Sequence, residues 1–317
     1  MKEKTFKQSI FIGFLFLSIF SGSVFGQQDT IKILAIGNSF SVDAVEHYLY
    51  NISSAEGVTV ILGNANIGGC SLETHWNNAN NNSAAYSYTK IEKGVYSHSK
   101  SKTLSECILD EDWDYITLQQ VSQNSGMPET YFPYLTNIIK YVKDKSNNPD
   151  VKLAMHMTWA YANNSTHSGF AKYNNNQTKM FEAIVSSVNS AALKAGISIV
   201  IPAGTAVQNA RSSSLGDNFC RDGYHMNNWG WYTIACTWAE KLFGVKTIGC
   251  TFVPSDISAA NALIMQTAAH NALLHPNEVT SMGGSVAIES VIPKKSINTD
   301  FVNATPSNTT CYNRTNP

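Results

Sequence analysis

Residues 31–41, IKILAIGNSFS, decide the fold of this chain. The first seven form an almost continuous apolar run that ends in Gly37, as expected for a parallel strand buried on both faces. The polar residues behind the run lead into a segment of helical periodicity at 44–55. A buried strand that passes into a helix in this way indicates a sheet covered by helices.

Four similar apolar runs follow along the chain: VTVILGNANI (58–67), WDYITLQQV (113–121), VKLAMHMTW (151–159) and ISIVIPAG (197–204). Helical periodicity occurs between and after them, at 131–145, 177–195, 229–243 and 257–274. This alternation predicts an α/β fold, a three-layer α/β/α sandwich around a mostly parallel five-stranded sheet. We expect the strand order 2-1-3-4-5.

The N-terminal stretch is typical of an export signal. Three lysines within residues 2–7 precede an apolar run at 10–20, and the small and polar SGSVFG follows. The run is shorter than the roughly 20 residues that span a membrane, although a retained N-terminal anchor is the alternative. We expect an exported protein, periplasmic or secreted and without a stable membrane anchor, with a signal peptide at 1–26, one main domain at 27–282 and a partly loose C-terminal extension at 283–317.

The composition excludes whole classes of protein. The 317 residues include 22 Lys and Arg against 23 Asp and Glu, giving a formal net charge of -1. A protein that binds nucleic acid by charge needs a basic excess, so no nucleic-acid partner is expected. The hydrophobic content of 43% is too high for a disordered chain. A globular enzyme or binding domain is what remains.

The six cysteines permit disulfides in an exported chain without requiring them. No C-x-x-C pair occurs and no group of His, Cys, Asp and Glu has ligand spacing, so neither a metal nor a cofactor is expected. Cys236 lies in an apolar helical run and is interpreted as a small buried side chain. Cys70, in a glycine-rich stretch, is compatible with either a disulfide or a free buried thiol.

Candidate site residues directly follow the apolar runs, because ligands of such sheets bind beyond the carboxyl ends of the strands. Ser39 follows the first run and precedes a helix, so it is either a nucleophile or, like Ser41, a helix N-cap. A nucleophilic serine needs a base. Asp222 and His225 lie three residues apart in one short loop, where a carboxylate can pair with an imidazole and orient it.

The other histidines fit different roles. His156 lies inside the fourth apolar run and is interpreted as a buried, hydrogen-bonded core residue. The remaining six are interpreted as surface or capping residues: His47, His75, His98, His167, His270 and His275.

With these motifs the sequence resembles the SGNH, or GDSL-like, hydrolases, and among them a branch of exported gut-bacterial proteins with GNSFS, IGGxSLE, LQQVS, TWAY and DGxH. The resemblance covers residues 31–244 and implies a flavodoxin-like domain that hydrolyses esters, commonly acetyl esters of carbohydrates, by a serine mechanism. It implies that Ser39 is the nucleophile and His225 the general base, oriented by Asp222. The backbone amides of Ser39 and Gly69 are implied donors of the oxyanion hole.

The sequence departs from the family pattern at two places. Asn38 stands where the family usually has an aspartate. The usual Gly-x-Asn-Asp of the third block is absent, so an amide side chain between 119 and 124 must complete the oxyanion hole. Gln123 occupies the expected position, and the alternatives are Gln119, Gln120 and Asn124.

The expected substrate is an acylated carbohydrate. Trp76 and Trp159 follow strand ends and are the aromatic residues expected to contact a sugar ring. The Asn-rich stretches 76–87 and 161–176 either cover the site or are plain surface loops, and they suit a glycan better than a lipid. We expect an exported serine esterase that removes acyl groups, in the simplest case O-acetyl groups. The alternatives are a lipase or thioesterase on the same scaffold and a catalytically silent carbohydrate-binding protein.

Overall fold

A computed structural model of the protein describes residues 30–283. The predicted signal peptide, nearly all of the predicted C-terminal extension and Cys311 lie outside the described residues. Within residues 30–283, no helix is both long and apolar enough to cross a bilayer.

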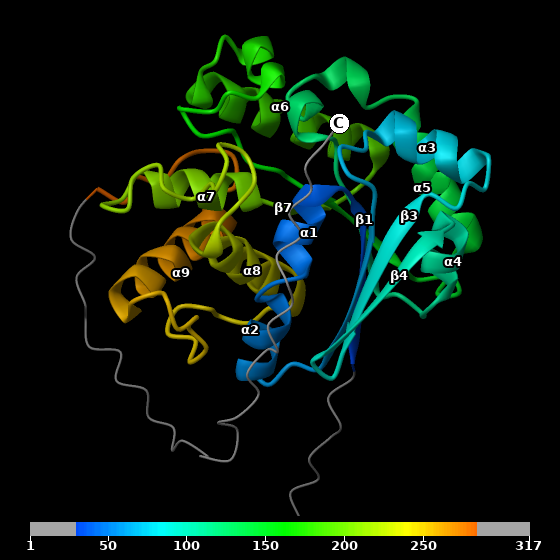
Figure 1. Ribbon diagram of the computed structural model, residues 1–317, viewed down its shortest axis with the longest axis horizontal. Coiled ribbons are helices and arrows are strands. Elements are labelled where there is room, and N and C mark those ends of the chain that lie inside the picture. Colours follow the sequence, from blue (N-terminus) through cyan, green and yellow to red (C-terminus); the bar gives the residue numbers. More distant parts are fainter. Residues whose placement is uncertain (1–29, 284–317) are drawn as a thin grey trace, which may run out of the picture.

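The centre of the molecule is a seven-stranded sheet in the order β4-β3-β2-β1-β5-β6-β7 (Figure 1). The five predicted strands are parallel and stand in the predicted 2-1-3-4-5 order. They are β1 (Ile31–Gly37), β2 (Val60–Asn66), β5 (Tyr115–Leu118), β6 (Lys152–His156) and β7 (Ile199–Ile201). Because β1 pairs with β2 on one side and β5 on the other, its carboxyl end lies in the middle of the sheet.

Two antiparallel strands that the sequence did not predict extend the sheet beyond β2. They are β3 (Tyr86–Glu92) and β4 (Val95–Lys102), joined by a tight turn in which Lys93 and Gly94 both have positive φ. Strand β4 lies at the sheet edge and is largely exposed, so its sequence VYSHSKSK lacks the apolar signal of the other strands. The predicted five strands are therefore the parallel part of a larger mixed sheet.

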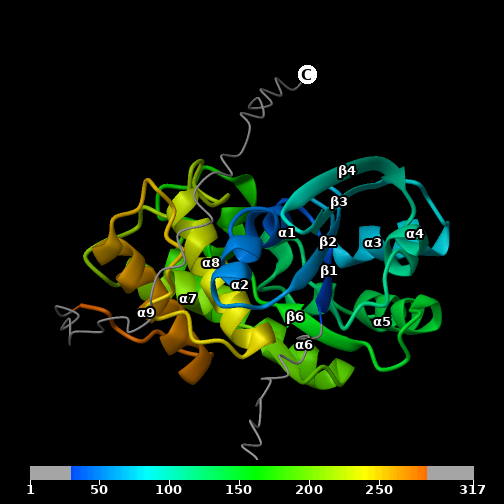
Figure 2. The same cartoon turned by 90° about the horizontal axis from the view of Figure 1, so that it is seen from below.

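Helices cover both faces of the sheet, which confirms the predicted three layers (Figures 1 and 2). On one face lie α3 (Leu72–Asn80), α4 (Leu104–Leu109) and α5 (Tyr134–Lys145). On the other lie α1 (Ser39–Val45), α2 (Leu49–Ala55) and α8 (Asn228–Phe243), with α7 (Ala203–Arg211) and α9 (Ala259–Leu274) packed against α8. Helix α6 (Gln177–Ala195) contacts β7 and α7. The described residues also form three short 3-10 helices, η1 (Ser122–Asn124), η2 (Pro128–Thr130) and η3 (Ser168–Tyr173).

Two helix predictions needed correction. The single helix expected at 44–55 is the pair α1 and α2, and α1 begins at Ser39 because the Asn38 side chain accepts the amide of Phe40 and caps it. The Asn-rich stretch from Trp76 was interpreted as a loop, yet its first half belongs to α3. Ser71 caps that helix, and its buried face overrides the low helix propensity of its asparagines.

Candidate active site

Asn38 fixes the end of β1 to the segments that follow the two neighbouring strands. Its Oδ1 accepts hydrogen bonds from the amide of Phe40 at 3.0 Å and from Nε2 of Gln119 at 2.8 Å. Its Nδ2 donates to the carbonyl of Cys70 at 3.0 Å. An aspartate could accept the first two bonds but could not donate the third. The unusual asparagine therefore holds the segment after β1 against the glycine-rich loop after β2.

The D-G-x-H motif forms a tight turn that is closed by its own aspartate. Oδ1 of Asp222 accepts the amides of Tyr224 and His225 at 3.2 and 2.8 Å. Gly223 has φ of 89°, and a Cβ there would lie 2.9 Å from Cα of Ser165. The turn thus requires glycine, and it leaves Oδ2 of Asp222 free to reach the imidazole ring.

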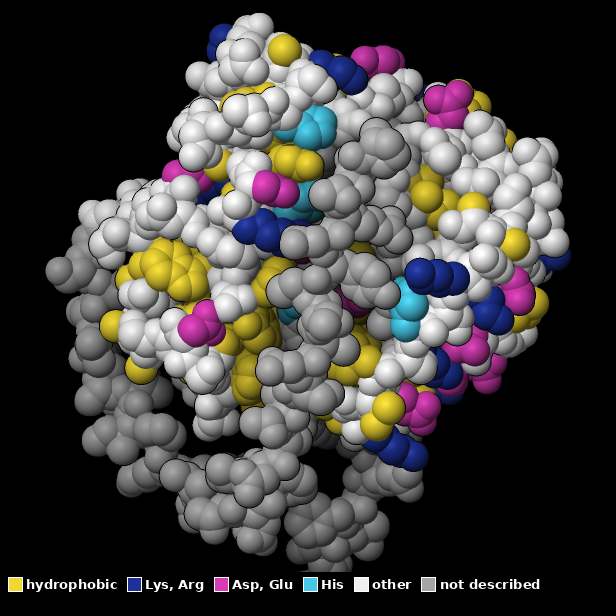
Figure 3. Space-filling view, viewed as in Figure 1, with side chains coloured by type: hydrophobic (Ala, Val, Ile, Leu, Met, Phe, Trp, Pro, Cys, Tyr) yellow, Lys and Arg dark blue, Asp and Glu magenta, His cyan; other side chains and the backbone are white. Residues whose placement is uncertain are grey.

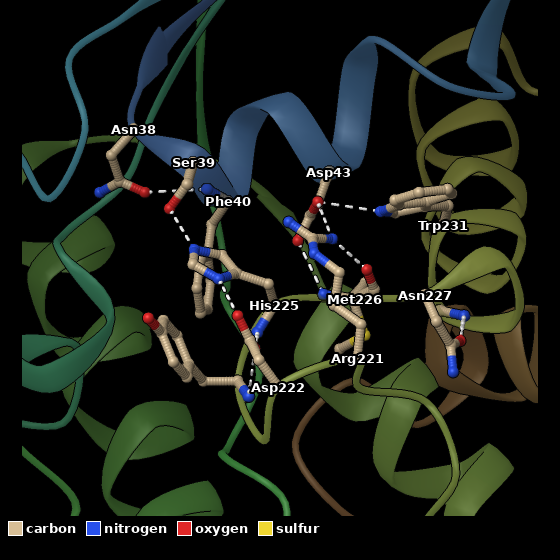
Figure 4. Close-up of polar contacts among 12 residues, drawn as sticks. Asn38, Ser39, Phe40, Asp43, Arg221, Asp222, His225, Met226, Asn227 and Trp231 are labelled. Atoms are coloured by element: carbon tan, nitrogen blue, oxygen red, sulfur yellow. Dashed lines mark hydrogen bonds and ion pairs between the residues drawn. The ribbon is translucent and has the colours of Figure 1, made fainter. Parts of the chain in front are cut away.

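Ser39, His225 and Asp222 come together as the sequence predicted (Figure 4). Oδ2 of Asp222 lies 2.7 Å from Nδ1 of His225, and Nε2 of His225 lies 2.8 Å from Oγ of Ser39. Since the carboxylate can only accept, Nδ1 carries the ring proton and Nε2 is left to accept from the Ser39 hydroxyl. This arrangement can move the hydroxyl proton from Ser39 to His225.

The carboxyl of Asp222 is held in its charged form. Partial burial acts to raise its pKa, but the hydrogen bonds from the His225 ring and from the amides of His225 and Tyr224 outweigh that effect. The pKa therefore lies below the usual value for aspartate. An ionised Asp222 can stabilise an imidazolium on His225.

A buried aspartate that the sequence analysis missed anchors the His225 turn. Asp43 lies four residues after Ser39 on α1, so both side chains point toward the turn (Figure 4). Its side chain is 1% exposed. Oδ1 accepts from Arg221 Nη1 at 3.1 Å and Trp231 Nε1 at 2.9 Å, and Oδ2 accepts from the amide of Met226 at 2.8 Å. Asp43 thus binds the chain on both sides of residues 222–225.

Two backbone amides are available where an oxyanion hole was expected. Among the hydrogen bonds within residues 30–283, none uses the amide of Ser39 or that of Gly69. Gly69 has φ of 64° and lies in a turn that the Cys70 amide closes onto the carbonyl of Ile67 at 3.1 Å. Both amides thus have no hydrogen-bond partner in the described part of the chain, and their role as oxyanion donors stays a prediction.

The four amide side chains proposed as the third donor differ in the hydrogen bonds that they already make. Gln120 donates to Thr130 and accepts two backbone amides, so its bonding capacity is taken. Gln119 is buried between Asn38 and His156, and Asn124 accepts from a lysine. Gln123 is half-buried, and among the described residues its amide nitrogen has no partner. Asn124 is also half-buried, and its amide nitrogen likewise has no partner within residues 30–283. The structure therefore leaves Gln123 and Asn124 as the candidates for the third donor.

Of the two tryptophans predicted to contact substrate, the structure contradicts one. Trp159 is 0% exposed, and its ring stacks on Phe40 at a centroid distance of 4.2 Å. Its Nε1 donates to the carbonyl of Tyr224 at 2.7 Å. Trp159 therefore packs against Phe40, the residue after Ser39, and against the His225 turn, and it has no exposed surface with which to contact a ligand. Trp76 lies half-buried on α3, and its contact with substrate stays a prediction.

His156 and His75 are both core residues. His156 is 1% exposed and donates from Nδ1 to Oε1 of Gln119 at 2.9 Å, which confirms its interpretation. His75 was expected at the surface, but α3 turns it inward against the hydroxyl of Tyr86 at 3.0 Å. Burial lowers the pKa of His156 to about 3 and that of His75 to about 4. Neither is placed to serve as the base for Ser39.

The stretch 161–176 packs against the site. The ring of His167 lies 4.7 Å from that of Tyr224, which lies 4.2 Å from that of His225. Partial burial lowers the pKa of His167. A Cβ at Gly169 would lie 2.3 Å from Cβ of Gln123, so the close approach requires glycine. Of the two interpretations of this stretch, covering a site is the one that the structure supports, and His167 is not a plain surface residue.

Metal-ligand groups and disulfides are not found in the described part of the chain. Within residues 30–283, no three side chains of His, Cys, Asp or Glu gather as a metal would require. The five described cysteines are free thiols. Cys236 is fully buried as expected, and Cys70 is a buried thiol whose pKa burial raises to about 12.

The chain belongs to a family described as "Domain of unknown function (DUF4886)", whose model matches residues 32–272. A DUF4886 family protein from Bacteroides uniformis ATCC 8492, solved by crystallography, is similar at 47% identity, with a TM-score of 0.79 over 80% of this chain and 98% of that chain. A search of curated proteins finds no match.

Several esterase structures overlap with the fold at low identity. The acetylxylan esterase Axe2 from Geobacillus stearothermophilus has 10% identity and a TM-score of 0.44 over 67% of this chain and 93% of its own. A carbohydrate esterase family 3 protein from Talaromyces cellulolyticus has 12% identity and a TM-score of 0.44 over 68% and 97%. Because both scores lie below 0.5, these likenesses carry no weight for the activity of this chain.

Proposed function

We propose that this member of the DUF4886 family is a serine esterase that removes O-acetyl groups from a carbohydrate. The observation that carries the proposal is the unbroken chain of two hydrogen bonds, 2.7 and 2.8 Å long, from Asp222 through His225 to Ser39. These two hydrogen bonds join a nucleophile, a base and an orienting carboxylate, the three groups that the serine acyl-transfer mechanism requires.

In the proposed reaction, Oγ of Ser39 attacks the carbonyl carbon of the ester while His225 takes the hydroxyl proton. Asp222 stabilises the imidazolium that forms. The amides of Ser39 and Gly69, with the side-chain amide of Gln123, bind the negative oxygen of the tetrahedral intermediate. The imidazolium then gives its proton to the ester oxygen of the sugar as the bond between that oxygen and the carbonyl carbon breaks, and the sugar leaves with a free hydroxyl. Water, activated by His225, releases acetate from the acyl-enzyme and restores Ser39.

The surroundings of the site support a polar substrate over a lipid. On the face of the molecule seen in Figure 3, histidine, acidic and basic side chains lie close together, with hydrophobic side chains beside them. The large hydrophobic side chains that residues 30–283 leave exposed are Val95, Tyr96, Leu109, Leu193, Leu274 and Val279, and none belongs to the segments that form the site. A lipase or thioesterase would need an apolar surface here to bind an acyl chain. The lysines and apolar run within residues 1–26 support export as the setting of this activity.

The proposal is tested with purified protein and a panel of acetylated and methyl-esterified plant and host glycans. Released acetate and methanol are measured separately. We expect acetate from at least one glycan and no methanol, with Ser39→Ala inactive on the same glycan. Release of methanol alone would make the enzyme a methylesterase. No release of either product from any glycan would count against carbohydrate as the substrate class.

A further inference from the structure

A polar cavity of about 500 Å³ adjoins the candidate active site. Its wall comes from three segments, around Asn164, from Asp217 to Gly223, and from Asn227 to Trp229. Asp222 lines this cavity and also binds the ring of His225, so the cavity and the triad share a side chain. The volume lies in the range of ligand pockets, which is about 300–1,000 Å³.

The charged groups of the cavity already have partners. The carboxylate of Asp217 lies 2.8 Å from Nε of Arg211, and Asp222 pairs with His225. Arg221 is bound to Asp43. The cavity therefore presents paired charges, which suits a neutral ligand better than an ionic one.

Uncharged groups in the same wall are free to bind. The side chain of Asn164 makes no hydrogen bond within residues 30–283, and Asn218 uses only its amide nitrogen, which donates to a backbone carbonyl at 2.8 Å. Half-buried Trp229 adds an aromatic ring. Free amides beside an indole ring match the hydroxyls and the apolar C–H faces of a sugar.

We propose that this cavity is a second sugar subsite, which binds an unesterified unit of an oligosaccharide while a neighbouring acetylated unit lies at Ser39. The inference rests on the proposed esterase function and narrows its substrate to a chain of several sugar units. One imidazole ring and two hydrogen bonds separate Asp222 from Oγ of Ser39, a separation that a short oligosaccharide spans. A monosaccharide acetate would fill only the position at Ser39.

The first test compares substrates of different length. Acetylated tetrasaccharides of xylose, mannose and glucose and the matching monosaccharide acetates are assayed for kcat/KM with the wild type, Asn164→Ala and Asn163→Ala. Asn163 is the matched control, because it shares a turn with Asn164 but does not line the cavity. For at least one sugar, the wild type should have a higher kcat/KM on the tetrasaccharide than on the monosaccharide acetate. Asn164→Ala should reduce this ratio about 5- to 10-fold, the typical effect of one lost hydrogen bond. Asn163→Ala should leave it unchanged.

The second test measures binding without catalysis. The same tetrasaccharides without acetyl groups are titrated into Ser39→Ala, alone and combined with Asn164→Ala or Trp229→Ala. Binding that both added substitutions weaken supports the subsite, even if no ester is hydrolysed and the esterase proposal fails. Hydrolysis of 4-nitrophenyl acetate without any preference for tetrasaccharides, or an Asn163→Ala effect as large as that of Asn164→Ala, would overturn the subsite and leave the esterase intact.

Discussion

Replacing Asp43 by alanine tests whether the buried carboxylate positions the His225 turn. The substitution removes a carboxylate that accepts three hydrogen bonds. The donors are the buried amide of Met226, the indole of Trp231 and the guanidinium of Arg221. An orphaned buried donor costs about 1–3 kcal/mol. Because the side chain of Arg221 is 44% exposed, its ion pair contributes only about 1 kcal/mol. The free energy of unfolding should therefore fall by about 4 kcal/mol.

The effect on turnover separates positioning from stability. A catalytic group displaced by about 1 Å can cost about 10²-fold in rate, so kcat of Asp43→Ala should fall by about that factor with little change in KM. Urea denaturation and steady-state hydrolysis of 4-nitrophenyl acetate, at a temperature where the variant is folded, give both numbers. Glu46→Ala is the control, because Glu46 is an acidic residue at the C-terminal end of the same helix but bonds to Asn64 and not to the turn. If Asp43→Ala loses stability and keeps the kcat of Glu46→Ala, Asp43 has no positioning role.

Three further predictions concern the oxyanion donor, acid stability and metal dependence. Gln123→Ala should lower kcat by about 10²–10³ with little change in KM, whereas Asn124→Ala should not; equal turnover of the two variants would contradict the assignment. His75 and His156 have folded pKa values of about 4 and about 3, below the roughly 6.5 of the unfolded chain, so the stability they contribute is present above pH 6.5 and lost as the pH falls. Because both rings gain a proton on unfolding at low pH, the free energy of unfolding should fall by about 4 kcal/mol from pH 7 to pH 5. Urea denaturation at the two pH values measures this difference, and an unchanged free energy would refute the prediction. Full activity should survive treatment with EDTA, and a loss that zinc or calcium restores would show a metal requirement.

The parts of the fold that the sequence predicted are those with one dominant signal. The parallel strands β1, β2 and β5 are mostly buried on both faces and therefore appear as apolar runs. Strands β6 and β7 are less completely buried but keep apolar sequences. The hairpin of β3 and β4 was missed because its edge strand is exposed and polar, and because its Lys93-Gly94 turn lacks the Asn or Asp that usually precedes glycine in such turns. Helix α3 was missed because its asparagines favour loops, while burial of Leu72, His75 and Ala79 decides the outcome.

The candidate site divides in the same way. Ser39, Asp222 and His225 could be predicted because each lies in a short segment with its own motif. Asp43 could not, since its partners Arg221 and Trp231 are 178 and 188 positions away and only the tertiary fold brings them near. Trp159 was assigned wrongly for a related reason. Its position after a strand suggested exposure, but stacking on Phe40 buries it completely.

The most direct test of the serine mechanism is the initial rate of 4-nitrophenyl acetate hydrolysis by the wild type, Ser39→Ala and Ser41→Ala. Ser41 is the matched control, because its hydroxyl is buried and bonded to Asn38 and Asn64 instead of His225. We predict that Ser39→Ala loses on the order of 10⁴-fold or more in kcat, while Ser41→Ala keeps most of the wild-type rate. A Ser39→Ala variant that hydrolyses the ester at the wild-type rate would contradict the account, as would a wild type no faster than buffer.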